Sequence, residues 1–129
     1  MTRARALQIL FGWGLATAAA GGLAAAPEPE PAWLVVYRPG PAWLANQPLA
    51  KQPLKEHGRY MLDLYRRGLL QLAGPFGDDS GGALVFRAPG QREARAIVEA
   101  DPAVVDGVFR YELRPWKLVA WNELASGSR

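Results

Sequence analysis

The single histidine of this 129-residue chain is the side chain best suited to acid–base chemistry. An imidazole titrates near neutral pH, so His57 could act as a general acid or base. It lies on the apolar face predicted for one helix, whose other members are Leu54, Met61, Leu62 and Tyr65. This spacing predicts that the ring points toward a sheet or cleft. A core histidine bonded to a carbonyl or carboxylate would show the same pattern.

A catalytic imidazole needs an acceptor to orient it, and the acidic turn at residues 78–82 offers the best candidates. In this hypothesis Asp79 orients the histidine, with Asp78 as the other acceptor, while Asp78 and the Ser80 hydroxyl contact a ligand. The backbone N–H of Gly81 could approach an anionic oxygen closely, because glycine lacks a Cβ. Asp and Gly are also favoured in hairpin turns, so these residues could serve the turn alone.

Charge and composition restrict the ligands and partners. Arg59 could bind an acidic ligand, or it could be a solvated surface residue. The chain has no cysteine and one histidine, so thiolate zinc sites and multi-histidine sites within one chain are excluded, and we expect no cofactor. Arg3 and Arg5 lie in the N-terminal segment, which leaves thirteen basic against twelve acidic residues. No basic stripe stands out, so we expect no nucleic-acid partner.

The N-terminus has the order of a secretory signal. A short positive start is followed by an apolar stretch and then by small residues, so residues 1–26 are predicted to be a signal peptide. The alternative is an uncleaved membrane anchor. The alternating prolines of residues 27–32 predict an extended linker. We therefore expect an exported protein, periplasmic or secreted, with no membrane contact once the signal peptide is removed.

The elements that must position these residues lie in a domain predicted over residues 33–121. Short β-rich runs that end at Pro or Gly predict strands, and helical spacing of apolar residues predicts helices. The strands are expected at 33–37, 69–73, 82–87 and 108–118, the last interrupted or bent near Pro115, and the helices at 54–67 and 91–100. Residues 103–106 could add a short turn, and 122–129 are expected to be a flexible tail.

The predicted order of strand, helix, strand, strand, helix, strand is the ferredoxin-like β-α-β-β-α-β arrangement, an α+β fold. Its helices cover one face of an antiparallel sheet, so the other face must also be covered. With no second domain in the sequence, a homodimer packed sheet to sheet is expected, as a dimeric α/β barrel.

Several segments of the chain resemble the YciI-like, or YCII-related, family. They are Glu56-His57-Gly58-Arg59-Tyr60-Met61-Leu62, Gly74-Pro75-Phe76, Asp78-Asp79-Ser80-Gly81-Gly82, Asp101-Pro102 and Gly107-Val108-Phe109. The resemblance implies a dimeric α+β barrel of ferredoxin-like subunits. Most members have no known activity, but a related enzyme class removes chloride from a chlorinated hydroxyquinol. There a histidine with a nearby aspartate is the suspected catalytic pair.

Three functions remain open at this point. The first is a cofactor-free lyase or isomerase that acts on a small cyclic organic acid or phenol-like compound, with His57 as general acid–base. The second is a non-catalytic module that binds a small ligand. The third is a structural partner in the periplasm. An inward-facing His57 beside a cavity would favour the first two, and a sealed ring would eliminate both.

Overall fold

Four strands form one antiparallel sheet in the computed structural model, which describes residues 29–127. The strands are β1 (Ala32–Pro39), β2 (Leu70–Pro75), β3 (Gly82–Arg87) and β4 (Phe109–Trp116). They lie in the order β2-β3-β1-β4, which puts β1 and β3 in the centre and leaves β2 and β4 at the edges. This strand order matches the predicted ferredoxin-like α+β fold.

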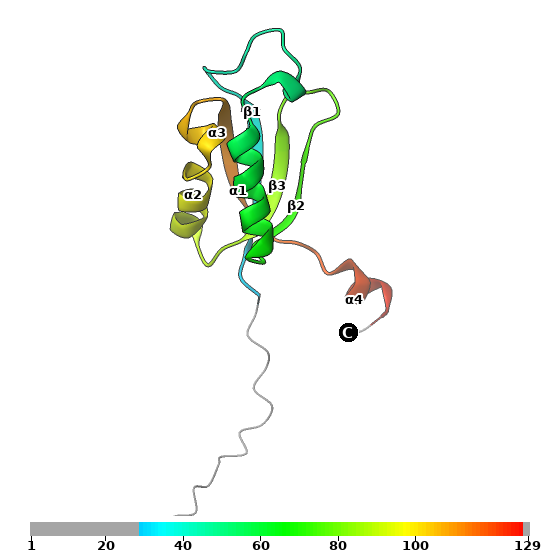
Figure 1. The fold of residues 1–129 in the computed structure, drawn as a ribbon. Helices are drawn as coiled ribbons and strands as arrows, with labels where there is room; N and C mark the ends of the chain where they lie inside the picture. Colours follow the sequence, from blue (N-terminus) through cyan, green and yellow to red (C-terminus); the bar gives the residue numbers. More distant parts are fainter. Residues whose placement is uncertain (1–28, 128–129) are drawn as a thin grey trace, which may run out of the picture.

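Three helices cover one face of this sheet, as Figure 1 shows. They are α1 (Lys55–Arg66), α2 (Gln91–Glu99) and the short α3 (Pro102–Val105). A 3-10 turn, η1 (Leu49–Lys51), lies in the connection before α1, and α4 (Trp121–Ala125) follows the last strand. The α4 helix projects away from the sheet (Figure 1) and has no buried residue.

The core lies between the sheet and these helices. On β1 the alternate residues Trp33, Val35 and Tyr37 face the helices and are buried, as the two-residue period of a strand requires. Phe86 of β3 and Val98 of α2 belong to the same cluster. The indole N–H of Trp33 donates to the Ala88 carbonyl at 3.1 Å, so the one polar group of that ring is satisfied.

The buried face of α1 differs from the prediction. Leu64 is the fully buried residue of this helix, and Leu54 and Met61 pack against the core. Leu62 and Tyr65 were expected on the same face, but both are exposed. The expected face was therefore too wide, because each residue turns by about 100° and a neighbour of a core position already points sideways.

The strand expected over residues 108–118 is not interrupted at Pro115, and it ends at Trp116. The β4 strand keeps its register with β1 through this residue, with Trp33 opposite Pro115 and Ala32 opposite Trp116. An edge strand tolerates proline, because the missing N–H can face outward where no strand needs it. The irregularity lies instead in β2, where the pairing with β3 shifts between Leu70 and Leu72.

The predicted segments before and after the domain compare differently with the structure. The predicted signal peptide, 1–26, lies outside the described residues. The segment expected to be a flexible tail contains the α4 helix in part. Within residues 29–127 the structure has no helix that is both long enough and apolar enough to cross a membrane.

Substitution of Gly81, with Gly58 as the control, tests the close approach of the β2–β3 turn to β1. Gly81 has φ +132°, and a Cβ at this position would overlap the Tyr37 carbonyl oxygen. We expect Gly81→Ala to lower the free energy of unfolding by about 2 kcal/mol or more, since strain and overlap add. Gly58→Ala, in α1 with open space around the added Cβ, should raise it by up to about 1 kcal/mol. Urea denaturation measures both, and equal effects would contradict the close approach.

Candidate functional site

The centre of the site is Asp101, a fully buried carboxylate between α2 and α3. Its Oδ2 atom lies 2.7 Å from Nδ1 of His57 and accepts the hydroxyl hydrogen bond of Tyr37 at 2.9 Å. Its Oδ1 atom accepts the backbone N–H of Ala103 at 2.9 Å, which caps the first turn of α3. One side chain therefore joins β1, α1 and α3.

The hydrogen bond to Asp101 assigns the roles of the two imidazole nitrogens. An ionised carboxylate can only accept, so Nδ1 of His57 carries the proton. In the neutral ring Nε2 is then an unprotonated acceptor. No partner of Nε2 is found in residues 29–127, and no buried side-chain nitrogen or oxygen there lacks a partner, so Nε2 reaches open space. This is the arrangement of an oriented general base.

Aromatic rings hold the imidazole in place. The His57 ring meets the rings of Tyr37 and Phe109 edge to face, with centroid distances of 5.4 Å in each case. Tyr37 and Phe109 stack on each other at 4.9 Å, and Trp43 lies 5.8 Å from Phe109. The histidine side chain retains 18% of its exposure, so it is held on three sides and open on one.

The Tyr37 hydroxyl is a neutral donor. Burial, followed by the negative charge of Asp101 and the hydrogen bond to it, raises the pKa of Tyr37 above its ordinary value. The phenol therefore stays protonated across the physiological range and remains bonded to the carboxylate.

A cavity of about 260 Å³ adjoins His57, between α1 and the β2–β3 side of the sheet. His57 and Tyr37 contribute the only polar side chains to its lining, and the hydroxyl of Tyr37 is already bonded to Asp101. The other lining residues are apolar or glycine, among them Leu49, Leu54, Met61, Gly81, Leu84 and Phe109. A few polar groups in an apolar concave surface are typical of small-molecule sites.

The loop that carries Leu49 to this cavity is closed by the Gln52 side chain. Gln52 is buried, and its amide oxygen accepts the Leu44 N–H at 2.7 Å. Its amide nitrogen donates to the carbonyls of Leu44 and Gln47 at 2.9 and 3.1 Å. These three hydrogen bonds hold one wall of the cavity in place.

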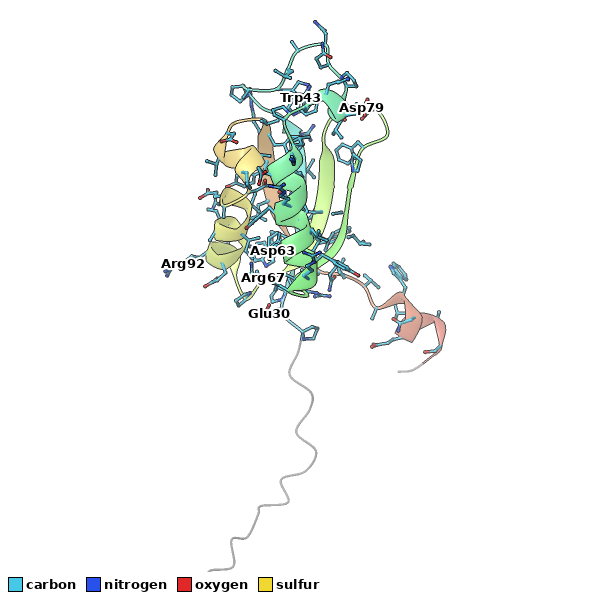
Figure 2. All side chains as sticks on the ribbon, in the orientation of Figure 1. Glu30, Trp43, Asp63, Arg67, Asp79 and Arg92 are labelled. Atoms are coloured by element: carbon cyan, nitrogen blue, oxygen red, sulfur yellow. The ribbon has the colours of Figure 1, made fainter. Side chains whose placement is uncertain are left out.

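The acidic turn does not orient the histidine, which is a correction to the expected pairing with Asp78 or Asp79. The Asp78 carboxylate accepts the backbone N–H and the hydroxyl of Ser80, at 3.0 and 2.5 Å, and these bonds lower the pKa of Asp78. Asp79 has φ +59° and lies at the tip of the hairpin (Figure 2). These residues make the turn, and none of the three lines the cavity within one chain.

Of the two remaining residues predicted to bind a ligand, one lies at the cavity and the other does not. Gly81 lines the cavity beside His57. Arg59 is exposed and forms an ion pair with Glu56 at 2.8 Å on the outer side of α1, so it is not brought to the cavity of its own chain. Of the sequence candidates, the structure therefore gathers His57 and Gly81.

Asp101 is the functional residue that the sequence analysis missed. The second helix was expected to end at residue 100 and Asp101 was given no role in the site, whereas Asp101 is the N-cap of α3, with Pro102 in the first turn. The signal that could have found it is this capping pattern, since a capping carboxylate has a second oxygen available for another donor.

Metal binding has no support in the part of the chain that the structure describes. No group of three or more His, Asp or Glu side chains there comes close enough together to hold an ion.

The fold and the site together define a ferredoxin-like α+β domain with a buried aspartate that orients a histidine beside an apolar cavity. The chain matches the YCII-related domain over residues 32–117. It therefore belongs to the YCII-related domain family, as the sequence resemblance indicated.

Two individual proteins are similar to this chain. The uncharacterized protein YjpA of Bacillus subtilis (strain 168) is 37% identical over 62 residues, which are 48% of this chain and 73% of that protein. A solved structure of 5-chloro-2-hydroxyhydroquinone dehydrochlorinase (TftG) from Burkholderia phenoliruptrix AC1100, in complex with 2,5-dihydroxybenzoquinone, has a TM-score of 0.49 and 21% identity. It covers 67% of this chain and 95% of its own.

Asp101→Asn tests the central carboxylate. The amide nitrogen cannot accept a hydrogen bond, so at least one of the three donors loses its partner in a buried site. We expect a loss of about 2–4 kcal/mol in the free energy of unfolding. Asp106→Asn, an exposed change at the other end of α3, should stay within about 0.5 kcal/mol. Equal small losses in chemical denaturation would show that the Asp101 network contributes little.

Proposed function

We propose that this protein is a cofactor-free enzyme, a lyase or isomerase, in which His57 is the general acid–base for a small ring compound. The observation that carries the proposal is the asymmetry of the imidazole, since Asp101 holds Nδ1 while the ring borders an apolar cavity. Asp101 takes the orienting role that the sequence analysis gave to Asp79.

In the proposed reaction Nε2 of His57 removes a proton from the ring compound. The imidazolium that forms is stabilised by the adjacent Asp101 carboxylate, which lies 2.7 Å from Nδ1. Return of the proton to another atom of the same ring gives an isomerase. Loss of a leaving group with the electron pair of the broken bond gives a lyase. Neither outcome needs an external oxidant or reductant.

The cavity favours a single ring of weak acidity. A cavity of roughly 150 Å³ is enough to hold benzene, so about 260 Å³ suits one substituted six-membered ring. No Lys or Arg lines this cavity, so a fully ionised carboxylate inside it would have no cationic partner. A neutral phenol-like compound fits this lining better than a cyclic carboxylic acid does.

A non-catalytic ligand-binding module is the second candidate. It is favoured by the apolar lining of the cavity. It is also favoured because His57 is the one acid–base side chain on the cavity wall, among the described residues, that has a polar atom free to meet a ligand, since the Tyr37 hydroxyl is bonded to Asp101. In that case the histidine would contribute a hydrogen bond and no proton transfer.

Ligand screening followed by turnover separates the two candidates. Single-ring phenols, quinols and cyclic acids are first screened by thermal shift on the full chain, because a bound compound raises the melting temperature. Each hit is then followed by NMR in D2O for proton exchange or loss of a substituent. We expect His57→Ala to lower the rate about 10²- to 10⁴-fold. Lys55→Ala, an exposed change on the same helix, should leave it unchanged.

The outcomes are distinct. Equal rates in the native protein and in His57→Ala would eliminate the proposed base. Binding of several rings without exchange or product would support the binding module. If the melting temperature responds to none of the compounds, neither candidate survives for this ligand class.

We further propose that the protein is exported and acts as a homodimer. Export is supported by the order of charged, apolar and small residues in segment 1–26. The dimer is supported by the sheet face opposite the helices, which carries Leu34 and Val85 and the exposed Leu72 and Trp116. Glu112 and Arg114 of β4 lie on the same face, so only part of it is apolar. An apolar region on a sheet face that no helix covers is typical of an interaction surface.

The mass in solution tests the dimer. Light scattering should give twice the mass of one chain for the native protein. Leu72→Arg combined with Trp116→Arg should give monomers, because each chain would bring two cations without partners into an apolar interface. Tyr65→Arg changes an exposed aromatic residue on the helical side and should remain dimeric. A native monomer, or a double variant that remains dimeric, would contradict this interface.

A further inference from the structure

Two donors compete for one carboxylate oxygen in this site, and only one of them belongs to the proposed acid–base group. Nδ1 of His57 and the Tyr37 hydroxyl both meet Oδ2 of Asp101, at 2.7 and 2.9 Å. The other oxygen, Oδ1, is occupied by the Ala103 N–H. The negative charge that faces the imidazole is therefore shared with a phenol that takes no part in proton transfer.

We propose that Tyr37 is a positioning residue that sets the proton affinity of His57 by sharing the Oδ2 atom of Asp101. This inference rests on the proposed function, because it assigns a role to the strength of the base. A hydrogen bond to a carboxylate oxygen draws charge from it and weakens its attraction for a neighbouring cation. With the phenol bonded, the carboxylate stabilises the imidazolium less than it would without the phenol.

The surroundings of the pair contain few other groups that could have the same effect. Asp101 is the titratable side chain bonded to His57, and Tyr37 is bonded to the same carboxylate while it meets the His57 ring edge to face. Tyr60 of α1 is the next, because the charge of Asp101 contributes, after burial, to the raised pKa of Tyr60. The Tyr60 hydroxyl donates to the Ile97 carbonyl at 2.7 Å and not to the carboxylate. The ring contacts of His57 are otherwise to Phe109.

Removal of one oxygen atom tests the inference. Tyr37→Phe keeps the ring that stacks on Phe109 and meets His57 edge to face, and it removes the donor to Oδ2. The chain has a single histidine, so an NMR titration of the imidazole reports on His57 alone. We expect its midpoint to rise by about half a pH unit to one unit in the full chain. Tyr60→Phe is the matched control and should leave the midpoint unchanged.

A second substitution should shift the His57 midpoint in the opposite direction, so the test does not depend on one variant that could fail to fold. Replacement of Tyr37 by 3-fluorotyrosine keeps the hydroxyl and makes it a stronger donor, so the His57 midpoint should fall. An unchanged midpoint in both Tyr37 variants, or shifts of the same sign, would overturn the inference. A purely structural tyrosine would change the melting temperature and not the midpoint.

The titration needs no substrate, so its failure and that of the proposed function can be told apart. If the midpoint moves as expected while no ring compound turns over, Tyr37 tunes the histidine and the proposed activity is wrong. If turnover is found, the acidic limb of its pH profile should move upward in Tyr37→Phe by the same amount as the NMR midpoint.

Discussion

The structure depends on one buried charge. Asp101 has no exposed surface, yet its oxygens meet donors from a strand, a helix and a backbone turn that lie far apart in the sequence. A buried carboxylate costs several kcal/mol unless its oxygens are bonded, so the alternatives to this geometry are strongly unfavourable. The same hydrogen bonds that link α1 and α3 to β1 therefore also hold His57 in the site.

Local pattern was sufficient for most of the fold. The β-rich runs that end at Pro or Gly and the helical spacing of apolar residues led to the correct element order, and that order led to the sheet. The errors fall where tertiary context decides. Leu62 and Tyr65 have the hydrophobicity of core residues, but they lie beside the contact stripe of α1. Pro115 reads as a strand breaker, but it sits on an edge, where no neighbour requires its N–H.

The candidate site also has a part that local sequence could predict and a part that it could not. The inward position of His57 could be predicted because helical spacing depends only on near neighbours. Its partner could not, since Asp101 is 44 residues away and meets the ring only after α1 and α3 pack together. Asp78 and Asp79 were expected to orient the histidine because they are carboxylates in the turn between two strands, and the same residues are what a tight turn requires. Local composition cannot separate these two uses.

The Gln52 side chain has a consequence for how the cavity could be filled. Its amide binds the backbone at Leu44 and Gln47, so the segment that presents Leu49 is already ordered before anything enters. A guest molecule then loses little affinity to loop immobilisation, and shape selectivity can be strict even for a compound with few polar atoms. Discrimination between similar rings would follow from this rigid wall more than from any added hydrogen bond.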